Sequence, residues 1–411
     1  MFAMAFRMGA ALVYSTLFHA SDVLAAFERL PWFVRLVSPA IGAFIGGVIT
    51  RAAAKFPSAA GVGDVMEAVV LGRVRLSLRA TASKALASFC AIVSGGSVGR
   101  EGPLVQFGGS LGAAVARVAE LSPTRMRALV AAGTAAGFAA AYNTPLAAVL
   151  FVVEVVSGVI AVEPLVMVLA GTAISTAFVR ATVGGGPIYG QRAFTVTGTT
   201  ELVMHALLGL FAALVAQGFM RLLAAGESLF AKTKLGQPWR ATLGGLLVGA
   251  MAIAWPQVAG NGYEPLAVLL DERYPLALLA MLLLAKMVAT TSSVGSGSPG
   301  GVFTPSLFVG GALGTLFGHG VAYALGTPES AGSYALVGMA AMTAATTHAP
   351  LMAAVLVFEL SDDYALVLPL LLATATAAFV SRRMNPDSIY TAELRRRGVE
   401  WKIEVTGGRS T

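Results

Sequence analysis

The sequence predicts an all-α polytopic membrane protein, because of its composition, its succession of apolar segments and an internal duplication. Of its 411 residues, 56% are hydrophobic and only 12% are charged, whereas soluble globular proteins average about 25% charged residues. This composition excludes an ordinary soluble enzyme, a disordered protein and a DNA-binding protein, so no nucleic-acid partner is expected. Basic clusters beside apolar segments, as at 382–383 and 395–397, are typical of cytoplasmic membrane flanks and predict a multi-pass protein of the inner membrane.

Apolar segments follow one another along nearly the whole chain, and these are the expected helices. Many are shorter than the roughly 20 residues that a perpendicular span needs, and glycines interrupt several. Such segments are typical of helices that enter the bilayer partway and end at an internal cavity. In order they are roughly 8–20, 33–50, 83–99, 104–120, 127–142, 146–162, 164–180, 202–220, 242–257, 275–294, 307–327, 334–347, 351–360 and 364–381.

Two blocks of the first half return in the same order in the second half. Residues 131–154 resemble 336–359, and residues 95–112 resemble 297–314. The matched positions include Gly99/Gly301, Pro103/Pro305, Pro145/Pro350 and Glu154/Glu359. We therefore expect one transmembrane domain, 1–411, built of two repeats at about 1–225 and 235–390, with a short polar tail at about 391–411. A duplicated membrane chain is typical of a transporter or channel whose site lies between the repeats; the letters leave open whether they run parallel or inverted.

The Gly-rich segments 95–103 and 297–305 suit the binding of an anion. A glycine-rich turn that opens into a helix leaves backbone N–H groups unpaired at the positive end of the helix dipole. Several such ends that converge would hold an anion without a buried cation. The alternative is that the glycines only let helices pack closely.

Glu101 lies within one of these segments, in the sequence GREGP. An acidic residue inside an apolar stretch is costly unless it has a partner or a function. Its carboxylate could occupy an anion site when it is ionised and leave the site when it is protonated. The alternative is a structural ion pair with the adjacent Arg100.

Four sequence blocks resemble the CLC family of chloride channels and chloride/proton exchangers. They are GREGP (99–103), GGVFTP (300–305), PLAAVLFVVE (145–154) and NPDSIYTAELRRRG (385–398). The resemblance implies an inverted-repeat bundle of many tilted and partly spanning helices. It also implies a homodimer in lipid with one anion pathway per subunit, chloride as the substrate, protons as a further partner, and neither a metal, a cofactor nor an enzymatic reaction.

The resemblance also implies roles for individual residues. Glu101 matches the external gating glutamate, which is also the proton acceptor. Val302 and Phe303 match positions whose backbone amides face the anion, and Tyr390 matches the tyrosine that holds the central ion from the inner side. Without the resemblance, Tyr390 would be interpreted as an interfacial aromatic anchor. The expected anion-binding set also includes Arg100, Gly102, Gly61 and Ala60.

Two departures from the family pattern affect the predicted mechanism. Where the family has GSGIPE, this chain has AAGVGD, so that Ala60 replaces a serine whose hydroxyl would face the anion. Where exchangers carry an inner proton-relay glutamate, this chain has Val155, and Glu163 is the substitute that remains. We therefore expect chloride transport gated by Glu101 that is channel-like or weakly proton-coupled. The alternative is a chloride/proton antiporter whose proton route avoids the usual inner glutamate.

Other classes of protein fit the sequence less well. An intramembrane hydrolase is the remote alternative, since Ser296 and Ser298 lie among glycines with His319 and His348 downstream, but no G-x-S-x-G frame is present. No Gly-Lys-Ser/Thr motif follows the glycine runs, which excludes a P-loop. A cation transporter would need more carboxylates or polar oxygens in the interrupted segments. Anion selectivity and voltage dependence stay open.

Overall fold

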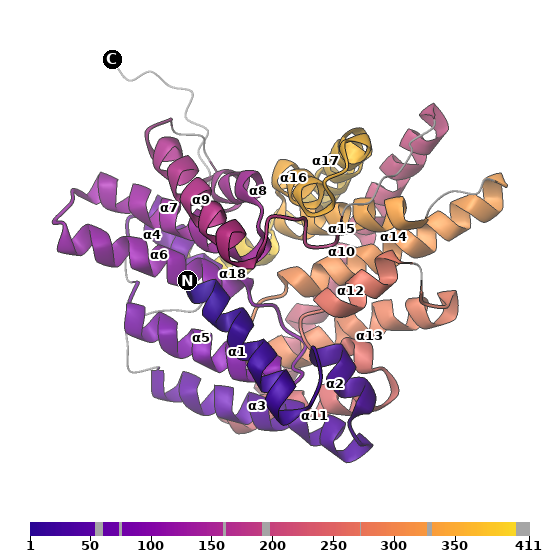
Figure 1. Ribbon diagram of the computed structural model, residues 1–411, viewed down its shortest axis with the longest axis horizontal. Coiled ribbons are helices and arrows are strands. Elements are labelled where there is room, and N and C mark those ends of the chain that lie inside the picture. Colours follow the sequence, from indigo (N-terminus) through magenta and orange to yellow (C-terminus); the bar gives the residue numbers. More distant parts are fainter. Residues whose placement is uncertain are drawn as a thin grey trace.

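The computed structural model describes residues 1–53, 61–73, 76–158, 162–190, 198–271, 273–326 and 331–399, and these residues are predominantly helical (Figure 1). Within these ranges no β-strand occurs; Gly99 and Gly301 form an isolated antiparallel bridge. The predicted all-α class is confirmed. The part of the predicted tail at 400–411 lies outside the described residues.

The helices of the first half include short and long members. Their bounds are α1 Phe2–Leu17, α2 Val23–Arg29, α3 Trp32–Ala53, α4 Val62–Val70, α5 Leu78–Val93, α6 Glu101–Val118, α7 Pro123–Tyr142, α8 Pro145–Leu150, the π-helix η1 Phe151–Ser157, and α9 Val162–Val183. Prolines begin α7 and α8, where the missing N–H costs nothing. The expected segment 83–99 ends early, at Val93, because the chain turns at Gly95 with a positive φ of 95°.

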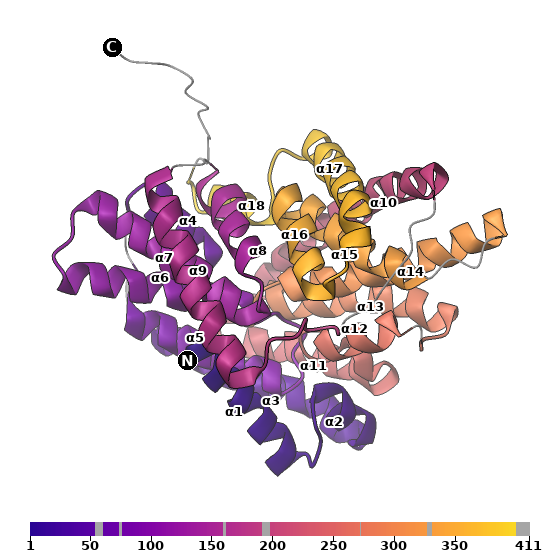
Figure 2. The same ribbon diagram turned by 45° about the horizontal axis from the view of Figure 1, so that its top comes forward.

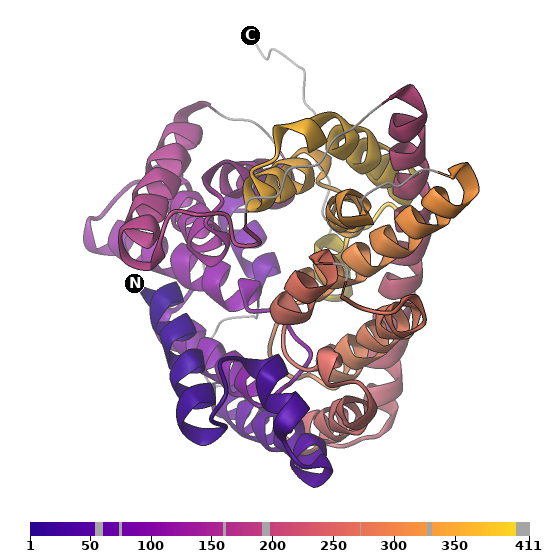
Figure 3. The ribbon, with the colours of Figure 1, turned by 45° about the vertical axis from the view of Figure 1, so that its right-hand side comes forward.

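The second half follows the same pattern. Its helices are α10 Thr199–Lys232, α11 Trp239–Ala254, the 3₁₀ turn η2 Pro256–Val258, α12 Tyr263–Leu270, α13 Leu276–Gly295, α14 Phe303–Leu325, α15 Ala331–Thr347, α16 Pro350–Ser361, the 3₁₀ turn η3 Tyr364–Leu366, α17 Val367–Met384 and α18 Ile389–Arg396. Figure 3 shows α1–α9 on one side of the molecule and α11–α17 on the other, with α10 beside the second set.

Six segments in the described part of the chain are long and apolar enough to cross a membrane. They are Trp32–Ala53, Pro164–Val183, Thr199–Lys232, Leu276–Gly295, Phe303–Leu325 and Tyr364–Arg396. Some of the other helices are far shorter than the roughly 20 residues of a span; α4 has nine residues, α8 six and α12 eight. Partial helices of this kind place their ends inside the protein.

The two halves are joined by two equivalent sets of hydrogen bonds, in each of which a glutamate of one half accepts from backbone N–H groups of the other half. The Glu154 carboxylate accepts hydrogen bonds from the N–H groups of Leu351 (3.3 Å) and Met352 (2.7 Å) at the start of α16. The matching Glu359 accepts from Leu146 (3.0 Å) and Ala147 (2.8 Å) at the start of α8. Each glutamate thus satisfies N–H groups at the first turn of the other repeat's short helix. The two short helices, α8 and α16, lie side by side (Figure 2).

Helices within each half cross closely through paired glycines. A Cβ on Gly108 of α6 would lie 2.0 Å from the carbonyl oxygen of Gly133 in α7. At the matching crossing of α14 and α15, a Cβ on Gly310 would lie 2.4 Å from the carbonyl oxygen of Gly338. Small residues that let backbones touch are typical of membrane helix packing. The limits of the two repeats, at about 225 and 235, stay a prediction.

Gly108→Ala is expected to destabilise the protein, because the added methyl group meets a backbone carbonyl that cannot move without separating α6 from α7. Overpacking of this kind costs about 1–3 kcal/mol. The control is Gly218→Ala in α10, where a Cβ meets nothing within 4 Å. Thermal unfolding in detergent should show a lower midpoint for Gly108→Ala and an equal or higher midpoint for Gly218→Ala. Equal stability of the two variants would contradict the packing argument.

Candidate functional site

The N-terminal ends of four helices line a cavity of about 600 Å³. Its wall includes the first residues or N-caps of α4, α6, α14 and α18, namely Gly61 and Val62, Glu101 and Gly102, Val302 and Phe303, and Ile389 and Tyr390. Each helix start carries N–H groups without an intrahelical partner and the positive end of a helix dipole. A cavity on which several such ends open is suited to an anion.

Glu101 lines this cavity and is almost fully buried, at 3% exposure. Its Oε1 accepts a hydrogen bond of 2.8 Å from the hydroxyl of Tyr142. Its Oε2 occupies the space that side chains would need on Gly99 and Gly301, the two glycines of the antiparallel bridge. A Cβ added to Gly99 would lie 2.1 Å from this oxygen, and one added to Gly301 would lie 2.9 Å from it. Only glycine at these two positions leaves room for the carboxylate.

Arg100 caps α6 but is directed away from the cavity wall. Its guanidinium carbon lies 4.8 Å from the centroid of the Tyr263 ring, and its Nη2 donates to the Ala141 carbonyl at 3.4 Å. This geometry is a cation–π contact. Arg100 is absent from the described residues that form the wall, so the structure does not bring it together with the other expected anion-binding residues.

Tyr390 lies in the first turn of α18 and lines the same cavity as Glu101. A capping box in which Ser388 and Thr391 bond each other's backbone N–H begins this helix. The Tyr390 ring packs edge-on against Phe151, with 6.4 Å between ring centroids. The ring is therefore held by the first half of the chain although it belongs to the second half.

The remaining expected residues are not in this wall or are not described. Val155 is buried in η1, against α4. Ala60 and the side chain of Glu163 lie outside the described residues. The serine–histidine pairs of the hydrolase alternative do not form either, because the Ser296 hydroxyl donates to the Ser293 carbonyl and His348 lies 3.4 Å from Ser381.

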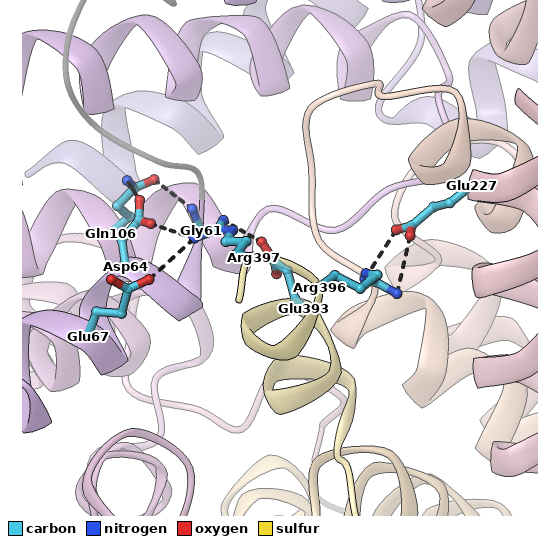
Figure 4. A network of polar contacts seen from close by, with 8 residues as sticks. All are labelled: Gly61, Asp64, Glu67, Gln106, Glu227, Glu393, Arg396 and Arg397. Carbon is cyan, nitrogen blue, oxygen red and sulfur yellow. Dashed lines mark hydrogen bonds and ion pairs between the residues drawn. The ribbon is translucent and has the colours of Figure 1, made fainter. Parts of the chain in front are cut away.

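A polar network fixes the helix that carries Tyr390 (Figure 4). The Gln106 side chain accepts from the Gly61 N–H (3.2 Å) and donates to Asp64 (3.1 Å). Arg397 at the end of α18 donates to Asp64 (2.9 Å) and to Glu393 (2.6 Å). The network thereby joins α4, α6 and α18 at the wall of the cavity, which Gly61, Gln106, Glu393 and Arg397 help to line.

A second ion pair holds the other side of α18. Arg396 lies 3.2 Å from Glu227 of α10 (Figure 4). The sequence reasoning missed Gln106, Asp64 and these pairings, although the run of three arginines after Tyr390 was a usable signal that this helix end has acidic partners.

Comparison with known proteins places the chain among chloride transport proteins. The family model described as voltage gated chloride channel matches residues 41–382. A ClcB-like protein of Ralstonia nicotianae is 38% identical over 91% of this chain and 88% of its own length. The voltage-gated ClC-type chloride channel ClcB of Salmonella typhimurium is 35% identical over 90% of this chain and 89% of its own.

Solved structures agree with this at the level of fold. A slow cyanobacterial Cl⁻/H⁺ antiporter superposes with a TM-score of 0.87 over 96% of this chain and 94% of its own, at 23% identity. A CLC-type fluoride/proton antiporter gives 0.72 over 94% and 95%, at 20% identity. The chain therefore belongs to the CLC family of chloride channels and transporters, and it is a multi-pass inner-membrane protein with the inverted-repeat fold of that family.

Proposed function

We propose that this chain conducts chloride through the cavity described above, with Glu101 as the gate at one end and Tyr390 at the other. The observation that carries the proposal is the convergence of four helix beginnings on a cavity that also contains the buried carboxylate of Glu101. An ionised carboxylate and a permeating anion compete for the same N–H groups, so protonation of Glu101 or its displacement by chloride opens the pathway.

The route of protons separates the two candidate mechanisms. Valine at position 155 cannot carry a proton, which favours channel-like or weakly coupled transport. Antiport is supported by the cavity itself, because its wall contains Glu393 as well as Glu101, and water along such a wall could deliver protons without an inner relay. Glu163 remains a candidate from the sequence alone.

The transport unit is proposed to be a homodimer in lipid with a pathway in each subunit. Exposed apolar side chains on the outer faces of helices, such as Leu207 and Leu214 of α10 and Ile174 of α9, suit contact with lipid or a second subunit. The proposed reaction is passage of an ion, so it is not enzymatic and requires neither a cofactor nor a metal.

Glu101→Gln is expected to abolish the pH dependence of chloride flux while flux itself persists. The amide resembles the protonated carboxyl group in size and in its lack of charge, and it cannot titrate. The measurement is chloride efflux from liposomes containing purified protein, over a range of pH. Glu120→Gln, which changes an exposed glutamate just beyond the end of α6, is the control and should behave as the unaltered protein. Unchanged pH dependence in Glu101→Gln would remove Glu101 from the mechanism.

Tyr390→Ala is expected to weaken anion binding and selectivity at the inner side of the cavity, and Tyr390→Phe should separate the hydroxyl from the ring. A hydrogen bond to a charged group is worth about 1.5–3 kcal/mol, so a loss of at least about tenfold in chloride affinity is predicted for both variants. Calorimetric titration with chloride provides the measurement, with Tyr364→Phe, an exposed tyrosine of η3, as the control. Wild-type affinity in both Tyr390 variants would show that the hydroxyl does not hold the ion.

A further inference from the structure

The hydroxyl of Tyr142 lies between the proposed gate and a neighbouring threonine. It donates to Glu101 Oε1 at 2.8 Å and lies 3.1 Å from Thr304 Oγ1. Tyr142 is the last residue of α7 and Thr304 the second residue of α14, so the contact joins the two repeats at the gate. Nothing in the proposed function uses either side chain.

The Tyr142 ring is held firmly, which gives its hydroxyl a defined position. The side chain is 1% exposed. Its ring centroid lies 4.9 Å from that of Phe138 and 5.7 Å from that of Phe303, distances at which aromatic rings attract one another. The helix ends directly after Tyr142, at Asn143 with a φ of 58°, so the C-terminal end of α7 positions the ring beside Glu101.

The hydroxyl groups can serve both protonation states of Glu101. Each hydroxyl has one proton to donate and lone pairs to accept. When Glu101 is ionised, Thr304 donates to Tyr142 and Tyr142 donates to the carboxylate. When Glu101 is protonated, its own proton can be donated to Tyr142, and Tyr142 then donates to Thr304.

The two arrangements are unequal in strength. A hydrogen bond to an ionised carboxylate is about twice as strong as one between neutral groups. The Tyr142 hydroxyl therefore stabilises the ionised carboxylate in the position seen here, and Thr304 provides the acceptor that the tyrosine needs once that charge is gone.

We propose that Tyr142 and Thr304 form a positioning pair for the gate. The Tyr142 hydroxyl donates a hydrogen bond that holds ionised Glu101 in the anion pathway, and the Thr304 hydroxyl accepts the hydrogen bond of Tyr142 when Glu101 is protonated. The pair thereby sets the pH at which the pathway opens. This inference rests on the proposed role of Glu101 in gating, and it adds two residues that act through Glu101 rather than on the ion.

Tyr142→Phe keeps the packed ring and removes only the hydroxyl. Loss of a donor to a charged group changes the balance between the two states about tenfold or more, which moves the midpoint of the pH profile of chloride flux by about one unit. The sign is upward, because the ionised state loses its donor and protonation then occurs at higher pH. Thr304→Val removes a hydrogen bond from both states, but only in the protonated state does it leave the Tyr142 proton without an acceptor, since the ionised carboxylate accepts that proton's hydrogen bond in the other state. The midpoint should therefore move downward.

The matched control is Tyr14→Phe, which removes another buried tyrosine hydroxyl, on α1, whose hydrogen bond is to the Ile92 carbonyl at 3.4 Å. Its profile should equal that of the unaltered protein. If the Tyr142→Phe profile superimposes on that of Tyr14→Phe, the inference is overturned. If Tyr142→Phe does not fold, Thr304→Val decides: a downward shift supports the pair, and an unchanged or upward profile overturns it.

A Glu101→Ala background separates this inference from the proposed function. If Glu101 is the gate, Glu101→Ala alone raises flux and removes its pH dependence, and adding Tyr142→Phe then changes nothing further. A pH-dependent Glu101→Ala variant would overturn the proposed gate. A pH-independent Glu101→Ala variant together with an unshifted Tyr142→Phe profile would overturn the positioning pair alone.

Discussion

The antiparallel bridge between Gly99 and Gly301 joins the two halves of the chain just before α6 and α14 begin, beside the proposed anion site. Each glycine donates its N–H to the carbonyl of the other, at N···O distances of 2.6 and 2.8 Å. Because backbone polar groups away from water must be satisfied within the protein, this exchange allows α6 and α14 to begin inside the molecule. The first N–H groups of both helices, which have no intrahelical partner, then lie beside the cavity, and the absence of side chains at the bridge makes room for the Glu101 carboxylate.

The cavity holds charge of both signs in separate places. Near Glu101, the helix beginnings contribute partial positive charges, and the guanidinium of Arg100 adds a full charge close by. Toward α18, the guanidinium groups of Arg396 and Arg397 are paired with Glu227 and with Asp64. These ion pairs fix the helix that carries Tyr390, so residues that neutralise one another's charge also position part of the cavity wall.

The sequence was sufficient for the membrane class and the all-α fold, and it indicated residues that the structure places at helix beginnings, because these depend on local composition and on motifs such as GREGP. The limits of the two repeats and the roles of the site residues stay predictions. It was insufficient for contacts between distant segments. The Tyr142–Thr304 and Asp64–Arg397 pairs join residues 162 and 333 positions apart, and no periodic pattern records such pairings. The segment expected at 146–162 is divided into α8 and a π-helix. Arg100 was expected at the anion site but stacks on Tyr263, since adjacent residues at a helix start point in different directions.

The most direct test of the account is simultaneous measurement of chloride and proton movement in liposomes that contain the purified protein, under a chloride gradient at clamped voltage. We predict chloride flux with little or no proton movement against its gradient, because Val155 cannot relay protons from the inner side. Proton pumping in fixed proportion to chloride would contradict the channel-like mechanism and show that another route reaches Glu101. The absence of chloride flux would contradict the account as a whole.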